Sequence, residues 1–222
     1  MITVCIASYN YHRFYPELFA SIGKQTNKDF KVILGIDGSR SDMDYVKENP
    51  VLAKVVYFPK NKGRYVTSNT LVNMADTSHV LFFDADDIMT PVLIDNVSGA
   101  LRRNGVVRYS ALYKKQDKTT SVCNIAHGSF CINKDLFMSL NGFREWPIAA
   151  DTEFLKRCNR LKVTEEFINK PLFYYRQHEG SLTKAKDTGF SSPLRRTYAN
   201  EIKTSSLDKP ETLAIHTEFI VV

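Results

Sequence analysis

The sequence predicts an α/β protein in which helices flank a mixed, mostly parallel sheet. Three observations support this fold class. Short apolar, β-branched segments alternate with longer amphipathic ones through the first half of the chain. The segment from Val80 to Phe83 is continuously apolar, as expected for a parallel strand that is buried on both faces. Acidic residues follow it directly, at the edge of the sheet where α/β proteins bind their ligands.

The elements of the first half are predicted from this alternation. Strands are expected at residues 2–7, 30–37, 55–58 and 79–84. Helices are expected at residues 16–24, 42–48 and 64–75, the first with Pro16 near its opening turn. This order of elements is typical of βα units that build a parallel sheet.

The second half is less regular. Helices are expected from Pro91 to about residue 104 and at residues 134–140, 150–161 and 194–206. Strands are expected at residues 106–112, 130–132 and 172–176, with a polar turn at 114–120 and a short apolar tail at 219–222. Residues 180–192 are rich in Ser, Thr, Lys and Gly, which predicts a mobile segment.

Length and composition indicate one ordinary globular domain. A chain of 222 residues can bury an adequate core. No apolar run reaches the roughly 20 residues that span a bilayer, so we expect no membrane span and a cytoplasmic location. The four cysteines have no Cys-x-x-Cys spacing, and we interpret them as structural thiols rather than as a disulfide or zinc site.

The net charge of +6 is unevenly distributed. Six basic residues between positions 102 and 118 stand against Asp117 alone; they are Arg102, Arg103, Arg108, Lys114, Lys115 and Lys118. Such a cluster is either a solvated face or a surface that attracts a polyanion through its long-range field. The sequence leaves both interpretations open.

The most informative segment is Asp84-Ala85-Asp86-Asp87, which follows a buried strand. The two-residue period of a strand points Asp84 and Asp86 to the same side, so both carboxylates can converge on one hard cation. Oxygen ligands favour Mg²⁺ or Mn²⁺ over zinc. Asp87 is equally suited to cap the next helix.

These motifs together resemble family 2 glycosyltransferases with the GT-A fold, over residues 2 to about 183. Asp84-Ala85-Asp86-Asp87 is similar to the metal-binding DxD motif of that family. Residues 4–10 resemble its opening strand and donor-nucleotide loop, and Ile36-Asp37-Gly38-Ser39 resembles the motif whose acid reads the uracil ring. Asn61-Lys62-Gly63 and Asn69 resemble the Asn-x-Gly loop and the asparagine that follows it.

The resemblance implies a Rossmann-like GT-A fold for nucleotide-diphospho-sugar transfer. It places the catalytic domain at residues 1–183, with a donor nucleotide-binding half at 1–90 and an acceptor half at 91–183. A flexible lid and a C-terminal helix and tail would follow at 184–222. The donor-binding residues that it implies are Ala7, Ser8, Tyr9, Asn10, Asp37, Asn61, Gly63, Arg64, Asn69, Asp84, Ala85 and Arg176.

The resemblance also implies catalytic, metal and acceptor residues. Asp151 aligns with the catalytic base, although this chain has Ala150-Asp151 where the family commonly has Glu-Asp. Asp84, Asp86 and His178 would hold Mn²⁺ or Mg²⁺. Gly128, Ser129 and Trp146 would line the acceptor side, and residues 183–192 would form a lid that excludes water.

The implied activity is an inverting, metal-dependent transfer of sugar from a UDP-sugar to an acceptor hydroxyl. A saccharide or glycoconjugate is the expected acceptor, and the basic cluster leaves DNA with hydroxymethylated bases as an alternative. The Gln-x-x-Arg-Trp motif of processive synthases is absent from the sequence. Two further alternatives are a nucleotidyltransferase, which would want a glycine-rich phosphate loop after the first strand, and a degenerate module that binds a sugar nucleotide without turnover.

Overall fold

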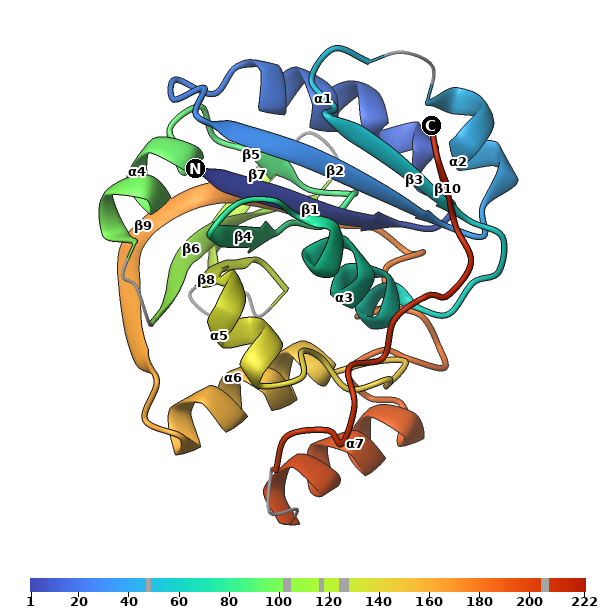
Figure 1. The fold of residues 1–222 in the computed structure, drawn as a ribbon, viewed down its shortest axis with the longest axis vertical. Helices are drawn as coiled ribbons and strands as arrows, with labels where there is room; N and C mark the ends of the chain where they lie inside the picture. The colour runs from blue at the N-terminus through green and yellow to red at the C-terminus, as the bar shows by residue number, and fades with distance from the viewer. Residues whose placement is uncertain (47–48, 102–104, 116–117, 124–127, 205–207) are drawn as a thin grey trace.

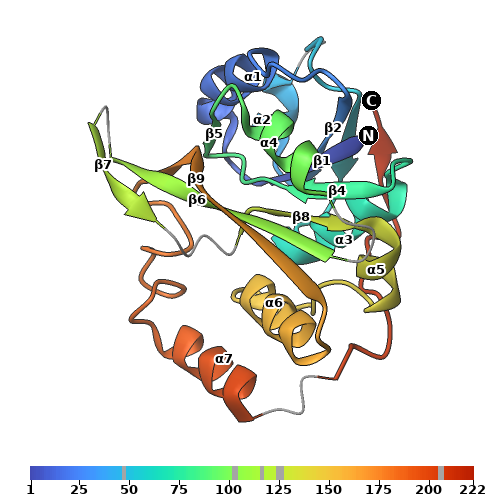
Figure 2. The ribbon, with the colours of Figure 1, turned by 90° about the vertical axis from the view of Figure 1, so that its left-hand side faces the viewer.

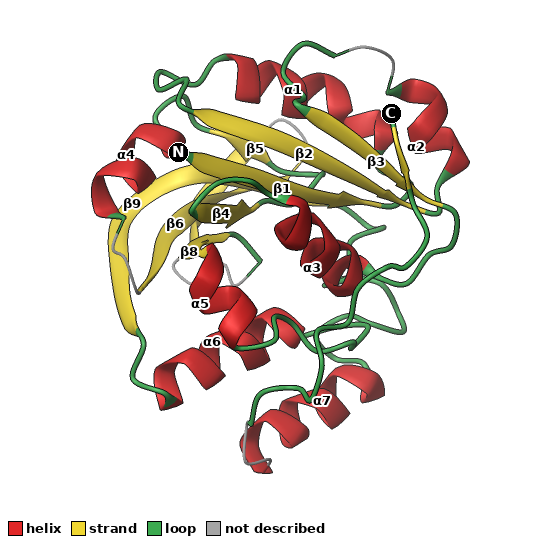
Figure 3. Ribbon diagram, in the orientation of Figure 1, coloured by secondary structure: helices red, strands yellow, loops and turns green. Residues whose placement is uncertain are grey.

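The computed structural model describes residues 1–46, 49–101, 105–115, 118–123, 128–204 and 208–222. Across these residues ten strands form one mixed sheet with helices on both faces (Figures 1 and 3). The strand order is β10-β3-β2-β1-β4-β8-β6-β9-β5, with β7 paired to β6 alone. The predicted fold class is therefore confirmed. No helix in the described part of the chain is both long and apolar enough to cross a membrane.

The parallel half of the sheet follows the predicted alternation closely. Its strands are β1 (Ile2–Ser8), β2 (Phe30–Asp37), β3 (Lys54–Phe58) and β4 (His79–Phe82). The helices between them are α1 (Tyr15–Gly23), α2 (Arg40–Tyr45) and α3 (Arg64–Met74), with a short 3-10 helix η1 at His12–Phe14. The end predicted for α2, at residues 47–48, lies outside the described residues.

The second half is mainly antiparallel. Its strands are β5 (Ile88–Met89), β6 (Gly105–Lys115), β7 (Lys118–Cys123), β8 (Phe130–Asn133), β9 (Thr164–Gln177) and β10 (Ile220–Val221). Its helices are α4 (Leu93–Ala100), α5 (Lys134–Ser139), α6 (Ala150–Arg160) and α7 (Pro193–Thr204). The ends predicted for α4 and α7 fall on residues 102–104 and 205–206, outside the described residues.

Three strand predictions need correction. Instead of a polar turn at 114–120, β6 extends to Lys115 and pairs with β7 as a hairpin that projects from the sheet (Figure 2). β9 begins at Thr164, eight residues before the predicted start at Leu172. The tail at 219–222 contains β10, which pairs antiparallel with β3 at the sheet edge.

The core has two layers, one on each face of the sheet. Alternate residues of β4 divide between them: Leu81 packs with α1 and α4, and Phe82 packs with α3, α5 and α6. This alternation explains why the strand is apolar throughout, since both of its faces are covered.

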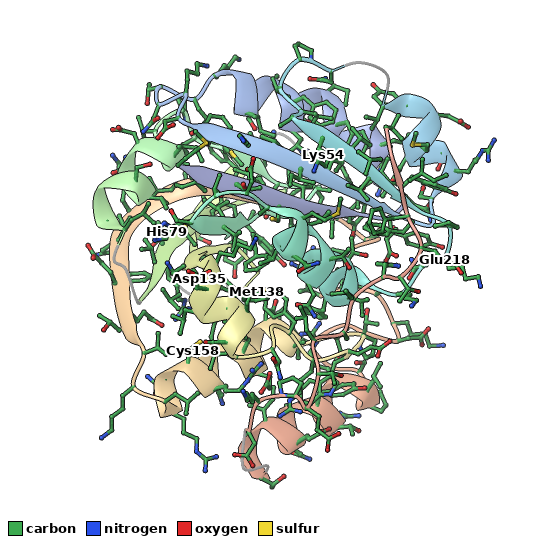
Figure 4. The ribbon with its side chains drawn as sticks, in the orientation of Figure 1. Lys54, His79, Asp135, Met138, Cys158 and Glu218 are labelled. Atoms are coloured by element: carbon green, nitrogen blue, oxygen red, sulfur yellow. The ribbon has the colours of Figure 1, made fainter. Side chains whose placement is uncertain are left out.

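All four cysteines are buried and unpaired, as predicted, and burial raises the pKa of the Cys5 thiol to about 12. Figure 4 shows Cys158 on α6.

Candidate active site

The carboxylates that follow β4 form a compact cluster. Asp84, Asp86 and Asp87 each offer an oxygen within 4.8 Å of the others. β4 ends at Phe82, and the Asp87 amide donates a hydrogen bond to the Asp84 carbonyl at 3.2 Å. The side chains are therefore brought together by a tight turn. The sequence instead suggests that the two-residue period of a strand does this.

The end of β9 closes the cluster from the other side. Pairing of Ile88 with Tyr174 places the residues after β9 beside the turn. His178 Nε2 lies 2.8 Å from Asp86 Oδ2, and the Arg176 amide donates to Asp87 Oδ1 at 2.8 Å. Arg176 Nε also donates to the Asp86 carbonyl at 2.7 Å. The structure thus joins Asp86 with Arg176 and His178, predicted site residues that lie about ninety positions further along the chain.

Arg64 is the main counterion of Asp84. Its guanidinium donates to both carboxylate oxygens, at 2.5 Å and 3.3 Å. Burial raises the pKa of Asp84 to about 6, and Asp86 and Asp151 add to the rise while Arg64 opposes it. Burial, together with the charges of Asp86 and Asp84, also holds the pKa of Asp87 well above its usual range. Burial and mutual repulsion therefore disfavour the charged forms of Asp84 and Asp87.

The donor set of the cluster fits a divalent cation. Carboxylate oxygens with one imidazole suit Mg²⁺ or Mn²⁺, and His178 already lies against Asp86. Asp87 Oδ2 is buried without a hydrogen-bond partner among the described residues, which is costly unless another group meets it. Since Arg64 holds Asp84, the side chains best placed to ligate an ion are Asp86, His178 and Asp87.

Asp151 opens α6 on the far side of Arg64. Ala149 precedes the helix with φ +64°, a left-handed conformation that turns the chain sharply into it. Asp151 Oδ1 accepts the Thr152 amide at 2.6 Å, the contact of a carboxylate with a helix N-terminus. The Asp151 charge acts on Asp84 and Arg64, so the predicted base lies near the cluster.

The three predicted acceptor residues have different surroundings. A Cβ at Gly128 would lie 2.8 Å from Asp84 Oδ2, so only glycine fits against the carboxylate. Ser129 is buried and bonds to the Phe82 carbonyl and the Tyr109 hydroxyl, so it supports the sheet instead of lining an open surface. The Trp146 ring packs on Tyr198 of α7, 4.6 Å between centroids.

The opening loop after β1 presents one exposed ring. Ala7 and Ser8 end the strand, and the Tyr9 side chain is 48% exposed, which leaves its face free to stack. Asn10 has φ +60°, and its side-chain oxygen accepts the Ser39 hydroxyl at 2.9 Å. Ser8 is buried and donates to Asp42 Oδ2 at 2.8 Å, so it fixes the loop rather than facing a ligand.

Asp42 is an anchor whose role the sequence pattern does not predict. Besides Ser8, its carboxylate accepts the backbone amides of Tyr11 and His12, at 3.2 Å and 2.9 Å. Asp42 is fully buried, and these contacts satisfy it. Its position five residues after Asp37 is visible in the sequence, but a contact across some thirty residues is not.

Two predicted donor residues have structural roles instead. Asp37 is 2% exposed, and its oxygens accept the amides of Lys62 at 2.9 Å and Gly63 at 2.8 Å, so it is not open to a base. Asn69 is fully buried, and its amide group bonds to the backbone of Phe143 and Ala214. Of the other predicted donor residues, Asn61 lies in the loop before α3 and Ala85 lies in the acidic turn.

An open cavity of about 840 Å³ lies next to Arg176 and His178, the two residues that contact the cluster from β9 and the loop after it. Arg176 and His178 line it beside Phe14, a residue that the sequence motifs do not single out. The guanidiniums of Arg13 and Arg176 both pack on the Phe14 ring, at 4.6 Å and 4.9 Å from its centroid. The rest of the lining comes from Lys115, Gln177, Glu179, Thr183, Lys184, Gly189, Phe190 and Ser191. The segment expected to act as a lid therefore forms one wall.

The fold and the acidic site define a GT-A glycosyltransferase, and comparison with known proteins agrees. The profile of the family described as Glycosyl transferase family 2 matches residues 3–202. This chain belongs to that family.

Curated relatives are also glycosyltransferases. One from Haemophilus influenzae, described as an uncharacterized glycosyltransferase, is 22% identical over 212 residues, which are 85% of this chain and 72% of the relative. One from Methanocaldococcus jannaschii, described in the same way, is 33% identical over 97 residues, 41% of this chain. The chain spans only 33% of the length of that relative and 39% of one from Nostoc.

Solved structures share the fold at low identity. S. aureus TarS 1-349 in complex with UDP-GlcNAc has a TM-score of 0.71 at 19% identity, over 94% of this chain and 68% of TarS. The mannosyltransferase PcManGT from Pyrobaculum calidifontis, in complex with GDP-Man and Mn²⁺, has a TM-score of 0.72 at 15% identity. That alignment covers 92% of this chain and 65% of PcManGT.

Proposed function

We propose that this glycosyltransferase moves a sugar from a nucleoside diphosphate to an acceptor hydroxyl by a single, metal-dependent displacement with inversion. The observation that carries the proposal is the partly buried acidic cluster, which lies directly against His178 and Arg64 and includes an Asp87 oxygen with no hydrogen-bond partner in the described part of the chain. A divalent cation held there would offset the negative charge of the departing diphosphate. Mn²⁺ is the first candidate, since PcManGT is described with it.

The chain's own residues would supply the remaining steps. Arg176 and Arg13, held against Phe14, present cations for the diphosphate. The acceptor oxygen bonds to the anomeric carbon while the bond from that carbon to the diphosphate oxygen breaks. The acceptor proton passes to the Asp151 carboxylate, which acts as general base. One displacement inverts the anomeric carbon, because attack and departure take place on opposite faces.

A UDP-sugar is the first donor to test, because TarS is described in complex with UDP-GlcNAc and the sequence motifs favour UDP. The buried Asp37 does not support direct reading of uracil, so GDP-sugars belong in the same panel, as PcManGT is described with GDP-Man. The half-exposed ring of Tyr9 would stack on either base.

A saccharide or glycoconjugate is the proposed acceptor. The positive charge of the basic cluster was the reason to consider DNA as acceptor, and acidic partners neutralise part of that charge. Arg108 pairs with Glu165 at 3.1 Å and Lys114 pairs with Glu17 at 2.9 Å. Arg102 and Arg103 lie outside the described residues.

A panel of nucleotide sugars tested with and without Mn²⁺ examines this proposal. One UDP-sugar should raise the thermal midpoint only with metal, by about 5–10 °C at a hundred-fold excess over Kd. Asp86→Ala should abolish the response, and Asp135→Ala, which removes an exposed carboxylate on α5 (Figure 4), should keep it. Asp151→Asn should keep donor binding and lose turnover. Equal loss of both by Asp151→Asn would show that Asp151 is not the base.

A further inference from the structure

The C-terminal segment crosses the molecule as a strap, defined here as residues 208–222. The strap runs from the acceptor half over α3 to the edge of the sheet (Figure 1). At its start the Asn141 side chain donates to the Pro210 carbonyl at 2.7 Å, and at its end the Val222 amide donates to the Val55 carbonyl at 2.9 Å. The sequence predicts only a C-terminal tail here, and these bonds fix both ends of the strap.

His216 is a deeply buried residue of the strap that the sequence pattern does not mark. It is 3% exposed, and its ring stacks on Phe58 at 4.0 Å between centroids. Its backbone amide donates to Thr70 Oγ1 at 2.9 Å, and its Nε2 lies 3.1 Å from Thr67 Oγ1. Both threonines belong to α3, so the ring is wedged between that helix and β3.

The same ring nitrogen meets a carboxylate of the donor half. His216 Nε2 lies 3.3 Å from Asp37 Oδ1, and both side chains are 2% exposed. A buried carboxylate needs several donors. Asp37 receives them from the Lys62 and Gly63 amides, and the His216 ring packs against its Oδ1.

This contact reaches the acidic cluster through the loop that Asp37 holds. Gly63 has φ +90°, begins α3, and directly precedes Arg64. Gly38, next to Asp37, packs so closely on this loop that a Cβ would lie 2.6 Å from the Asn61 amide nitrogen. A shift of Asp37 would therefore move the loop, and with it the guanidinium that holds Asp84.

We propose that His216 is a positioning residue of the donor site, which fixes Asp37 and, through the loop of Lys62 and Gly63, sets Arg64 against Asp84. The inference rests on the proposed function, because the effect it predicts is on the binding of a nucleotide sugar. The contacts of His216 are with Thr67, Thr70, Phe58 and Asp37, and not with the acidic cluster. Its role is to hold the loop in the conformation that receives the diphosphate.

The test separates this role from a merely structural one. His216→Ala should raise the KM for the donor roughly 10- to 100-fold, the change expected when a buried carboxylate loses a close polar neighbour. Its kcat at saturating donor should change less than about two-fold, because the base is untouched. His216→Gln, whose amide can still donate to Asp37, should recover most of the affinity.

Phe219→Ala is the matched control. Phe219 contacts the same Phe58 ring from the strap, 6.2 Å between centroids, and takes no part in the hydrogen bonds described for Asp37. It should lower the thermal midpoint while leaving the donor KM within about two-fold. If His216→Ala and Phe219→Ala both lower stability and both leave KM unchanged, the inference is refuted.

Two further measurements keep the test decisive. If His216→Ala does not fold, Asp37→Asn and His216→Phe, which keeps a ring but no polar atom, and their double variant replace it, and their effects on KM should be non-additive because the two side chains are in contact. Additive effects would overturn the inference. Should the wild-type protein bind no nucleotide sugar with metal, the proposed function fails, and the inference falls with it.

Discussion

Arg157 of α6 provides a direct test of what holds the acceptor half together. Its side chain is fully buried and donates to both oxygens of Glu153, at 2.9 Å and 3.0 Å. It also donates to the carbonyls of Leu140 and Gly142, at 2.5 Å and 2.7 Å. Substitution by Met would keep most of the length of the side chain and remove every donor.

The expected loss follows from the partners left behind. Glu153 would keep only Arg144, at 3.2 Å, and two buried carbonyls would lose their hydrogen bonds. Breaking a buried pair in this way costs about 3–5 kcal/mol. For a chain of this size that lowers the thermal midpoint by about 6–20 °C.

Thermal and urea unfolding followed by circular dichroism would measure the effect. Arg160→Met is the control, since Arg160 is exposed on the same helix, and it should cost less than about 0.5 kcal/mol. Adding Glu153→Gln to Arg157→Met should recover part of the stability, because a neutral amide needs no counterion. If Arg157→Met were as mild as Arg160→Met, the assigned role of the buried pair would be wrong.

Two further predictions concern the acidic cluster. Gly128→Val should displace the Asp84 carboxylate, because a Cβ at this position would lie 2.8 Å from Asp84 Oδ2. Metal-dependent donor binding, measured by calorimetry, should weaken by more than about ten-fold. Gly99→Ala, whose Cβ would meet nothing within 4 Å, should bind normally, and equal binding by both variants would contradict the packing argument. The second concerns pH: the pKa of Asp84 is raised to about 6, so the negative charge that Asp84 places beside the proposed ligands is lost as the pH falls through that value, and metal binding weakens. Mn²⁺ affinity should drop by up to about ten-fold per pH unit below it, and an affinity that does not change between about pH 7 and about pH 5 would refute the assignment.

The sequence was most informative where local pattern and burial agree. The four parallel strands were predicted within two residues at each end, because strands covered on both faces are apolar throughout. The first half of β9 was missed for the opposite reason. Residues 164–170 are polar and largely exposed near the sheet edge, so they lack the period of a buried strand.

The site was predictable where the chain itself carries the signal. Asp84 and Asp86 stand two residues apart after a buried strand, and that spacing was sufficient to suggest a metal site. The roles of Asp37 and Asn69 could not be predicted, because their partners lie on the strap and on distant loops. His216 carries no local sign at all, since a single histidine in a polar tail has no pattern.

The strap also determines where this protein can be shortened. The family profile ends at residue 202, and a chain cut at that limit would still match the profile in full. It would lack the His216 ring beside Asp37, the Ala214 and Pro210 carbonyls that accept from Asn69 and Asn141, and the strand that covers β3. Such a fragment would expose one flank of β3 to pairing with other chains, so we expect it to aggregate when expressed alone.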